Sequence, residues 1–179
     1  MYEGFSPFPG LKTTRLHLRK LSESDEGEIL FLRSDPVMNK YIHRQKMNGP
    51  EEAREFILRI DRDISDERCL YWAISAEDNL KLIGVICLWN FSEDHRIAEL
   101  GYELMPAFQK QGIMQEAVLC VLQYGFEQIS LEKIEAFTHK KNKNSIRLLK
   151  KNGFRLLSGR TDPHNASNVI YLLSKSEFS

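Results

Sequence analysis

The sequence lacks an excess of charge of either sign. Lys and Arg together number 25, Asp and Glu together number 25, and the formal net charge is +0. This balance excludes a strongly basic molecule that is drawn as a whole to nucleic acid or to an acidic membrane. We therefore expect neither nucleic acid nor membrane as a partner, and any site for an anion has to be local.

Long apolar runs are missing as well. No stretch approaches the roughly 18 uninterrupted apolar residues of a membrane-spanning helix, and the opening MYEGFSPFPG lacks the basic and then apolar pattern of a secretory signal. We therefore expect a cytoplasmic protein. The apolar share of 42% in 179 residues is enough for one sizeable core.

Cysteine is scarce. The three cysteines, Cys69, Cys87 and Cys120, lie far apart, and each is embedded in apolar sequence. An odd number of such residues favours reduced core thiols over disulfides or a zinc site. We expect no bound metal.

The N-terminal half contains a strand and several amphipathic helices. Residues 1–10, rich in proline and glycine, are expected to form a loose lead-in to a single domain over 11–179. Alternation around Leu16 and Leu18 predicts a half-buried strand. Helices are predicted at 22–33 with Ser22 or Ser24 as the N-cap, at 36–42 with Asp35 as the N-cap, and at 50–65 with Pro50 in the first turn.

The second half is richer in β structure. Three β-rich runs separated by short polar turns predict an antiparallel meander, and they lie at 70–76, 82–91 and 96–104. The elements expected after them are a helix at 112–129, a strand at 134–139, a helix at 143–152, and β-rich runs at 153–159 and 168–174. This order favours an α/β (α+β) fold with a central mixed sheet and helices on both faces.

The stretch QKQGIMQEA, from Gln109 to Ala117, opens the apolar helix expected at 112–129. The first turn of a helix carries backbone N–H groups without intrahelical partners. A phosphate can bind these groups where a glycine such as Gly112 permits close approach, and Lys110 adds a cation. Water or a side-chain cap would satisfy the same groups, so this stretch alone leaves both interpretations open.

The surrounding sequence resembles a known family. RIAELGYELMPAFQKQGIMQEAV is similar to the fourth strand, loop and third helix of the GNAT acetyltransferases. Within that family it resembles the branch of RimJ and RimL, which acetylate the N-termini of ribosomal proteins. TTRLHLRKLSESD resembles the opening strand and turn of this branch, and NKNSIRLLKKNGF resembles its late helix. Together the matches reach from about residue 11 to the C-terminus.

The resemblance implies the GNAT fold, with a mostly antiparallel twisted sheet of six to seven strands flanked by helices on both faces. It implies acetyl-CoA as the co-substrate and transfer of its acetyl group to a primary amine by direct attack on the thioester. The acceptor is a protein N-terminal α-amine or a small-molecule amine. No metal takes part, and the protein is expected to be a monomer or a homodimer.

Two departures from the family pattern raise a second hypothesis. Leu149 stands where many relatives carry a tyrosine that protonates the departing CoA thiolate, and Met114 stands where many carry Gly or Ala. A chain with these changes could be a GNAT-like module that binds CoA without transferring acetyl.

The resemblance also implies where the cofactor binds. The pyrophosphate of acetyl-CoA is expected on the backbone N–H groups of the loop and helix start, and the cofactor-binding positions there are Gln109, Lys110, Gln111, Gly112, Ile113 and Met114. Backbone N–H groups around Leu104 and Met105, before Pro106, are expected to bind the carbonyl oxygen as it becomes an oxyanion.

Two polar residues of the late helix complete the implied cofactor site. Asn142 is expected to bind the pantetheine arm. Ser145 is expected near the sulfur, where it could donate a proton in place of the missing tyrosine. Both residues also suit the cap of a helix, and the two roles are compatible.

Glu99 and Glu103 are the candidate bases, since alternation places both on one face of the strand at 96–104. Glu103 lies nearer the cofactor loop and is preferred, while Glu99 is equally well explained as a solvated or ion-paired residue. A lysine-like amine of pKa about 10.4 costs roughly 4–5 kcal/mol to deprotonate at pH 7, and an α-amine of pKa about 8 costs only about 1–1.5 kcal/mol. The lack of a conspicuous base therefore favours an α-amine acceptor.

Overall fold

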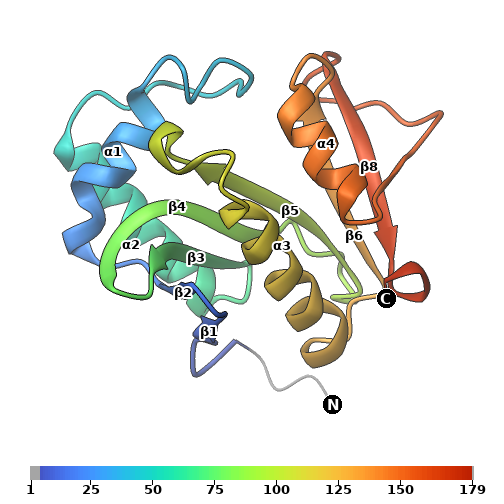
Figure 1. The fold of residues 1–179 in the computed structure, drawn as a ribbon, viewed down its shortest axis with the longest axis horizontal. Helices are drawn as coiled ribbons and strands as arrows, with labels where there is room; N and C mark the ends of the chain where they lie inside the picture. The colour runs from blue at the N-terminus through green and yellow to red at the C-terminus, as the bar shows by residue number, and fades with distance from the viewer. Residues whose placement is uncertain (1–4, 179) are drawn as a thin grey trace.

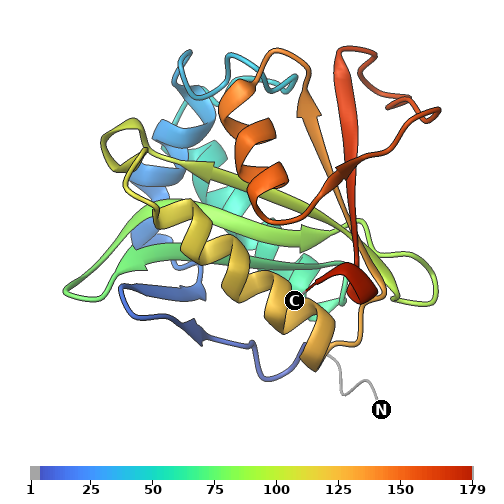
Figure 2. The same cartoon turned by 45° about the vertical axis from the view of Figure 1, so that its right-hand side comes forward.

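The computed structural model describes residues 5–178, and their strands form one sheet of eight strands in the order β1-β2-β3-β4-β5-β6-β8-β7. The strands are β1 (Leu11–Lys12), β2 (Leu16–Lys20), β3 (Cys69–Ala76), β4 (Asn79–Trp89), β5 (Ile97–Leu104), β6 (Lys133–His139), β7 (Arg155–Leu156) and β8 (Asn168–Ser174). The main helices are α1 (Glu26–Ser34), α2 (Pro50–Ser65), α3 (Ile113–Gln123) and α4 (Lys143–Lys151). Figures 1 and 2 show the sheet with helices on both faces, as predicted.

The sheet is mostly antiparallel, and the predicted meander is confirmed as β3, β4 and β5, each antiparallel to the next. The expected six to seven strands are corrected to eight. The expected first strand is divided by a turn at Thr13, whose side-chain oxygen accepts the N–H groups of Arg15 and Leu16. Leu11 consequently pairs with Leu18, and β1 and β2 form a hairpin.

Two apolar cores lie on opposite faces of the sheet. The helices α1 and α2 pack on the face that carries Tyr71 and Val85. The helices α3 and α4 pack on the face that carries Trp72 and Leu88. The predicted helix at 50–65 is confirmed as α2, because apolar residues at helical spacing bury one of its sides.

The predicted helix at 36–42 is wrong. The chain makes one turn there, in which the N–H of Asn39 reaches the Asp35 carbonyl at 3.1 Å, and then continues as a loop. Asp35 Oδ1 accepts the N–H groups of Val37 and Met38, both at 2.9 Å. These are the bonds expected of Asp35 as an N-cap. The ladder ends after one turn, where Asn39 Nδ2 donates to the Asp35 carbonyl at 2.7 Å and to the Leu32 carbonyl at 3.1 Å. The loop that results, over residues 35–49, forms one wall of the cleft described below.

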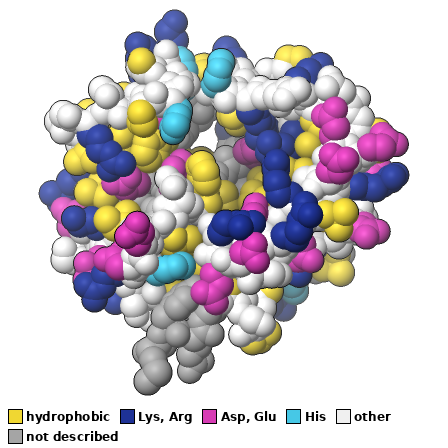
Figure 3. Space-filling model, turned by 180° about the vertical axis from the view of Figure 1, so that it is seen from behind, with side chains coloured by type: hydrophobic (Ala, Val, Ile, Leu, Met, Phe, Trp, Pro, Cys, Tyr) yellow, Lys and Arg dark blue, Asp and Glu magenta, His cyan; other side chains and the backbone are white. Residues whose placement is uncertain are grey.

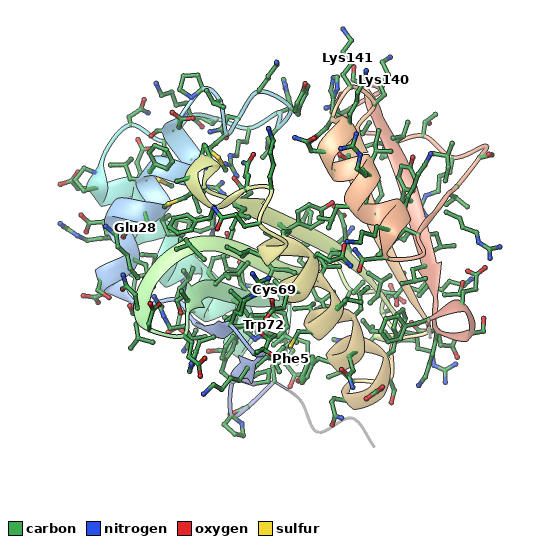
Figure 4. The ribbon with its side chains drawn as sticks, viewed as in Figure 1. Phe5, Glu28, Cys69, Trp72, Lys140 and Lys141 are labelled. Atoms are coloured by element: carbon green, nitrogen blue, oxygen red, sulfur yellow. The ribbon has the colours of Figure 1, made fainter. Side chains whose placement is uncertain are left out.

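The described part of the lead-in packs on the sheet. Residues 5–10 have no helix or strand, but Phe5 is only 3% exposed. The indole Nε1 of Trp72 donates a hydrogen bond to the Pro9 carbonyl at 2.7 Å. Phe5 and Trp72 are labelled on the same side of the sheet in Figure 4. Within the described residues, no helix is both long enough and apolar enough to cross a membrane.

The strands β5 and β6 separate soon after they meet. They pair in parallel only from Ile97 with Lys133 to Glu99 with Glu135, although β5 continues to Leu104 and β6 to His139. Figure 1 shows the two strands diverging toward the loops between α1 and α2. The second half of β5 therefore has one edge without a neighbouring strand, and the candidate site lies along this strand.

Candidate active site

A cleft of about 1280 Å³ lies along β5, between the α1/α2 side of the molecule and the segment that contains β6 and α4. Four residues predicted from the sequence line it, namely Glu99, Glu103, Asn142 and Ser145. Figure 3 shows the molecule hollowed on the face seen from behind. The loop from Gln109 to Met114, and Leu104 and Met105, do not line this cleft. The expected site residues therefore form two groups.

Glu103 is held by an arginine that the sequence pattern did not indicate. The two nitrogens at the end of the Arg44 guanidinium each donate to one Glu103 oxygen, both at 2.7 Å. The side chains are 14% and 12% exposed. Arg44 also donates to the Leu32 carbonyl and to Asn39 Oδ1, which fixes it in the loop. This bidentate pair occupies the oxygens that a base would offer to an amine.

Glu99 has a different environment. Among residues 5–178, its carboxylate has a single hydrogen-bond donor, Asn90 Nδ2, at 3.5 Å. Burial raises the pKa of Glu99 to about 7, and the nearby charges of Asp162 and Glu135 act in the same direction. Glu135 itself is ion-paired with Arg160. Glu99 is thus the cleft carboxylate whose pKa lies close to neutral pH.

Tyr102 is a site residue that the sequence reasoning missed. Its hydroxyl lies 2.8 Å from the Ser145 Oγ and bridges β5 to α4. Burial raises the pKa of Tyr102 to about 12, so the hydroxyl keeps its proton near neutral pH. One signal in the sequence could have indicated it. Alternation places a tyrosine on the strand face opposite Glu99, and the hydroxyl of a buried tyrosine usually has a hydrogen-bond partner.

The start of α4 agrees with the expected cap. Asn142 Oδ1 accepts the backbone N–H of Ser145 at 3.2 Å, which confirms Asn142 as the N-cap. Leu149, one turn beyond Ser145, is fully buried in the core. It brings no proton donor to the cleft.

The N-terminus of α3 is open. Gly112 is the N-cap residue, with φ +78 and no side-chain cap. The N–H of Glu116 is bonded to the Gly112 carbonyl at 3.1 Å, so the N–H groups of Ile113 to Gln115 precede the first bond of the helical ladder. The side chains of Ile113 and Met114 are buried in the core.

The loop before α3 is fixed by its own side chains. Gln109 Nε2 donates to the Leu104 carbonyl at 2.8 Å, and Gln111 Nε2 donates to the Ala107 carbonyl at 2.9 Å. Arg15 on the loop before β2 donates to the Gln111 carbonyl at 3.2 Å and pairs with Glu116. Lys110 is exposed. This arrangement of backbone donors and cations fits the pyrophosphate of a CoA molecule.

The backbone N–H groups of Leu104 and Met105 point to opposite edges of β5. The Met105 N–H donates to the Ile83 carbonyl at 3.0 Å, so it is engaged in the sheet. Because donors alternate between the two edges of an antiparallel strand, the Leu104 N–H points to the edge that β6 has left. The Leu104 carbonyl also points there, since it accepts from Gln109. Leu104 is therefore the residue whose N–H could bind a carbonyl oxygen in the gap.

The remaining predicted features concern thiols and metals. Cys69, Cys87 and Cys120 are free cysteines, and burial raises the pKa of Cys69 to about 12. Within residues 5–178, no group of three or more His, Cys, Asp or Glu side chains is arranged to hold a metal ion. The ring of His139, at the end of β6, contacts that of Tyr41 in a tilted arrangement, with ring centroids 5.3 Å apart. Lys140 and Lys141 follow it at the tip shown in Figure 4.

Comparisons with known proteins agree with this geometry. Residues 15–155 match the family model "Acetyltransferase (GNAT) domain". The N-acetyltransferase YoaA of Bacillus subtilis (strain 168) is 33% identical over 148 residues, which cover 83% of this chain and 84% of that protein.

Solved structures show the same fold. A GNAT-family acetyltransferase from Bacillus anthracis superposes with a TM-score of 0.79 at 23% identity, covering 94% of this chain and 100% of that chain. The ribosomal-protein acetyltransferase RimL in complex with coenzyme A superposes with a TM-score of 0.80 at 18% identity, covering 93% of this chain and 98% of that chain. With the family model spanning most of the chain, these findings establish that the protein belongs to the GNAT family of N-acetyltransferases.

Proposed function

We propose that the protein transfers the acetyl group of acetyl-CoA to a primary amine by direct attack of the amine on the thioester. The observation that carries this proposal is the arrangement of β5. This strand presents Glu99 to the cleft on one face, Tyr102 toward Ser145 on the other, and the Leu104 N–H to the gap left by β6. A base, a proton donor and an oxyanion donor are the three groups that the reaction requires.

The open N-terminus of α3 is proposed to bind the pyrophosphate of acetyl-CoA. The N–H groups of Gln111 to Met114 and the positive end of the helix dipole supply donors, while the exposed Lys110 supplies a cation. Support comes from the left-handed backbone at Gly112 and from the buried side chain of Met114. The pantetheine arm would then enter the gap between β5 and β6, near Asn142.

Glu99 is proposed as the general base, in place of the Glu103 favoured by sequence alone. A carboxylate with a pKa of about 7 is partly ionised near neutral pH and is a better proton acceptor than an ordinary glutamate. Glu103 instead positions Arg44 and the loop at 35–49.

Ser145 and Tyr102 are proposed to supply the proton for the departing thiolate. The tyrosine found at the position of Leu149 in many relatives is absent, but the Tyr102 hydroxyl lies in hydrogen-bond contact with Ser145. The Leu104 N–H would stabilise the carbonyl oxygen as it gains charge.

The acceptor is proposed to be an α-amine of a protein N-terminus or a small-molecule amine, in the manner of the RimJ and RimL branch. The resemblance of three separate sequence stretches to that branch supports this view. So does the cost of deprotonation, because an α-amine places a modest demand on a single carboxylate.

Two measurements test the proposal. Saturating acetyl-CoA should raise the melting temperature, and a panel of amines and N-terminal peptides should include acceptors that release free CoA thiol. Absence of both effects would remove the proposal. Binding of acetyl-CoA without turnover on any acceptor would instead favour a non-catalytic CoA-binding module.

A further inference from the structure

The α1/α2 side of the cleft carries arginine side chains that the proposed transfer does not use. Arg33 from α1, Arg44 from the loop at 35–49 and Arg59 from α2 all line the cleft. In Figure 3, Lys and Arg side chains form a band beside the hollow, over this part of the molecule. Three consecutive segments, α1, the loop at 35–49 and α2, thus bring positive charge to one wall.

Only one of these three cations is neutralised by the protein. Glu103 gives both of its oxygens to Arg44. Among the residues that the structure describes, no carboxylate forms an ion pair with Arg33 or Arg59. Both guanidinium groups instead approach the same ring, that of Phe56, with Arg33 Cζ at 4.2 Å and Arg59 Cζ at 5.2 Å from its centroid.

This arrangement costs free energy in the absence of a counterion. A contact with an aromatic ring is weaker than a bidentate pair with an oxyanion. Burial lowers the pKa of Arg33, and repulsion by the Arg44 charge lowers it further. A half-buried cation facing a cleft, with like charges beside it, is the environment that an anionic ligand would relieve.

The other charged groups of the cleft do not supply that anion. Arg68 holds Asp63, at 2.6 Å, and also Asp66. Arg160 is paired with Glu135. The cleft is also lined by Glu67, Glu93, Glu99 and Asp162, but among the described residues none of these forms an ion pair with Arg33 or Arg59. The two cations therefore have no carboxylate partner in the described part of the chain.

We propose that the amine acceptor also carries an oxyanion, a carboxylate or a phosphate, and that Arg33 binds it with the help of Arg59. The planar guanidinium of arginine matches both groups through two parallel N–H donors. The inference rests on the proposed function for the fate of the amine. The binding of the oxyanion itself can be measured without any turnover.

The test uses matched pairs of ligands that differ in one anionic group. All are dipeptide amides with a free α-amine, namely alanyl-glutamate against alanyl-glutamine, and alanyl-phosphoserine against alanyl-serine. Their dissociation constants are measured by calorimetry on the full chain in the presence of CoA. We expect at least one charged member to bind about tenfold more tightly than its neutral partner, which corresponds to about 1.4 kcal/mol. Whichever pair shows this tenfold difference in dissociation constant indicates whether the site prefers a carboxylate or a phosphate.

Variants assign the effect. Arg33→Gln should reduce the ratio to near one, and the exposed Arg59→Gln should reduce it in part. Arg68→Gln is the matched control, because this arginine lines the same cleft but is already paired, and its ratio should stay as in the parent. Equal binding of charged and neutral members by the parent overturns the inference, as does an unchanged ratio in both Arg33→Gln and Arg59→Gln.

The outcomes separate this inference from the proposed function. A parent that prefers the charged ligands but releases no CoA with any amine keeps the oxyanion site and loses the acetyl transfer. A parent that acetylates both members with equal KM keeps the transfer and loses the oxyanion site. Thermal melts of Arg33→Gln show whether the variant is folded, and Arg59→Gln decides the question if it is not.

Discussion

Both carboxylate oxygens of Glu103 accept hydrogen bonds from the Arg44 guanidinium, each at 2.7 Å. Glu99, on the same face of the same strand, has only the Asn90 amide, at 3.5 Å. Two glutamates with nearly identical sequence surroundings therefore have different roles. One is committed to an ion pair, and the other keeps a carboxylate free for the cleft.

Replacement of Glu99 by Gln should remove the general base. We expect kcat to fall by about 10²- to 10⁴-fold, the usual contribution of a positioned acid or base. The thermal shift caused by acetyl-CoA should persist, since Glu99 lies away from the α3 N-terminus. Steady-state thiol-release assays measure the effect, and a kcat within threefold of the parent would contradict the role of Glu99.

Replacement of Glu103 by Gln should act mainly on stability. The change leaves Arg44 without its charged partner, and the loss of hydrogen bonds to a charged group costs about 1.5–3 kcal/mol. Denaturant unfolding of Glu103→Gln measures this loss. The fall in kcat should be smaller than in Glu99→Gln, and the reverse order would restore Glu103 as the base.

The pH profile should report Glu99. Because the base must be ionised, kcat/KM should rise with pH through about 7. The folded-state pKa of Glu99 lies above its unfolded value, so the folded state holds this proton to higher pH. The contribution of Glu99 to stability is therefore fully present below the ordinary pKa of 4.5 and is lost as pH rises from there through about 7. Melting curves of the parent and of Glu99→Gln across this range should diverge with rising pH, and parallel curves would argue against the raised pKa.

Tyr102→Phe and Ser145→Ala should slow departure of the thiolate. We expect each to lower kcat by about 10²-fold, the lower end of the usual contribution of a positioned acid or base. The double variant should lose little beyond either single one, since the two hydroxyls act through one hydrogen bond. Kinetics with an acetyl thioester of a more acidic thiol provide the control, because a better leaving group needs less protonation. Additive losses would mean that the two residues act separately.

Gly112→Ala should weaken acetyl-CoA binding. Gly112 has φ +78, and alanine in that conformation costs about 1 kcal/mol or more of stability. Gly159 is the matched control, since it has φ +84 with nothing within 4 Å of an added Cβ. Both variants should lose stability, but only Gly112→Ala should also lose acetyl-CoA affinity, by roughly tenfold or about 1.4 kcal/mol. Calorimetric titration distinguishes the two, and equal affinities would argue against a pyrophosphate at the start of α3.

Local signals predicted most of the fold. Pro50 and the spacing of Phe56, Ile57 and Ile60 predicted α2, and Asn142 predicted the start of α4. The cap expected at Asp35 forms, but the helix expected at 36–42 ends after one turn because the Asn39 side chain bonds to the Leu32 and Asp35 carbonyls, which periodicity does not reveal. The strand count changed for a similar reason, through the side chain of Thr13.

The site was less accessible to sequence reasoning. Alternation placed Glu99 and Glu103 on one face but could not rank them, because the ranking depends on Arg44, which lies 59 residues away. The contact between Tyr102 and Ser145 joins residues 43 apart. Such pairs are set by how the helices and loops pack, so only the assembled fold identifies the better base and the proton donor.

The short pairing of β5 with β6 has a further consequence for the peptide groups along the free part of β5. A strand edge with unpaired peptide groups normally invites another polypeptide to add to the sheet. Here the free edge of β5 lies inside the sheet, between β5 and the diverging β6, and not at the outer edges formed by β1 and β7. The same peptide groups remain within reach of a narrow ligand that carries amides of its own.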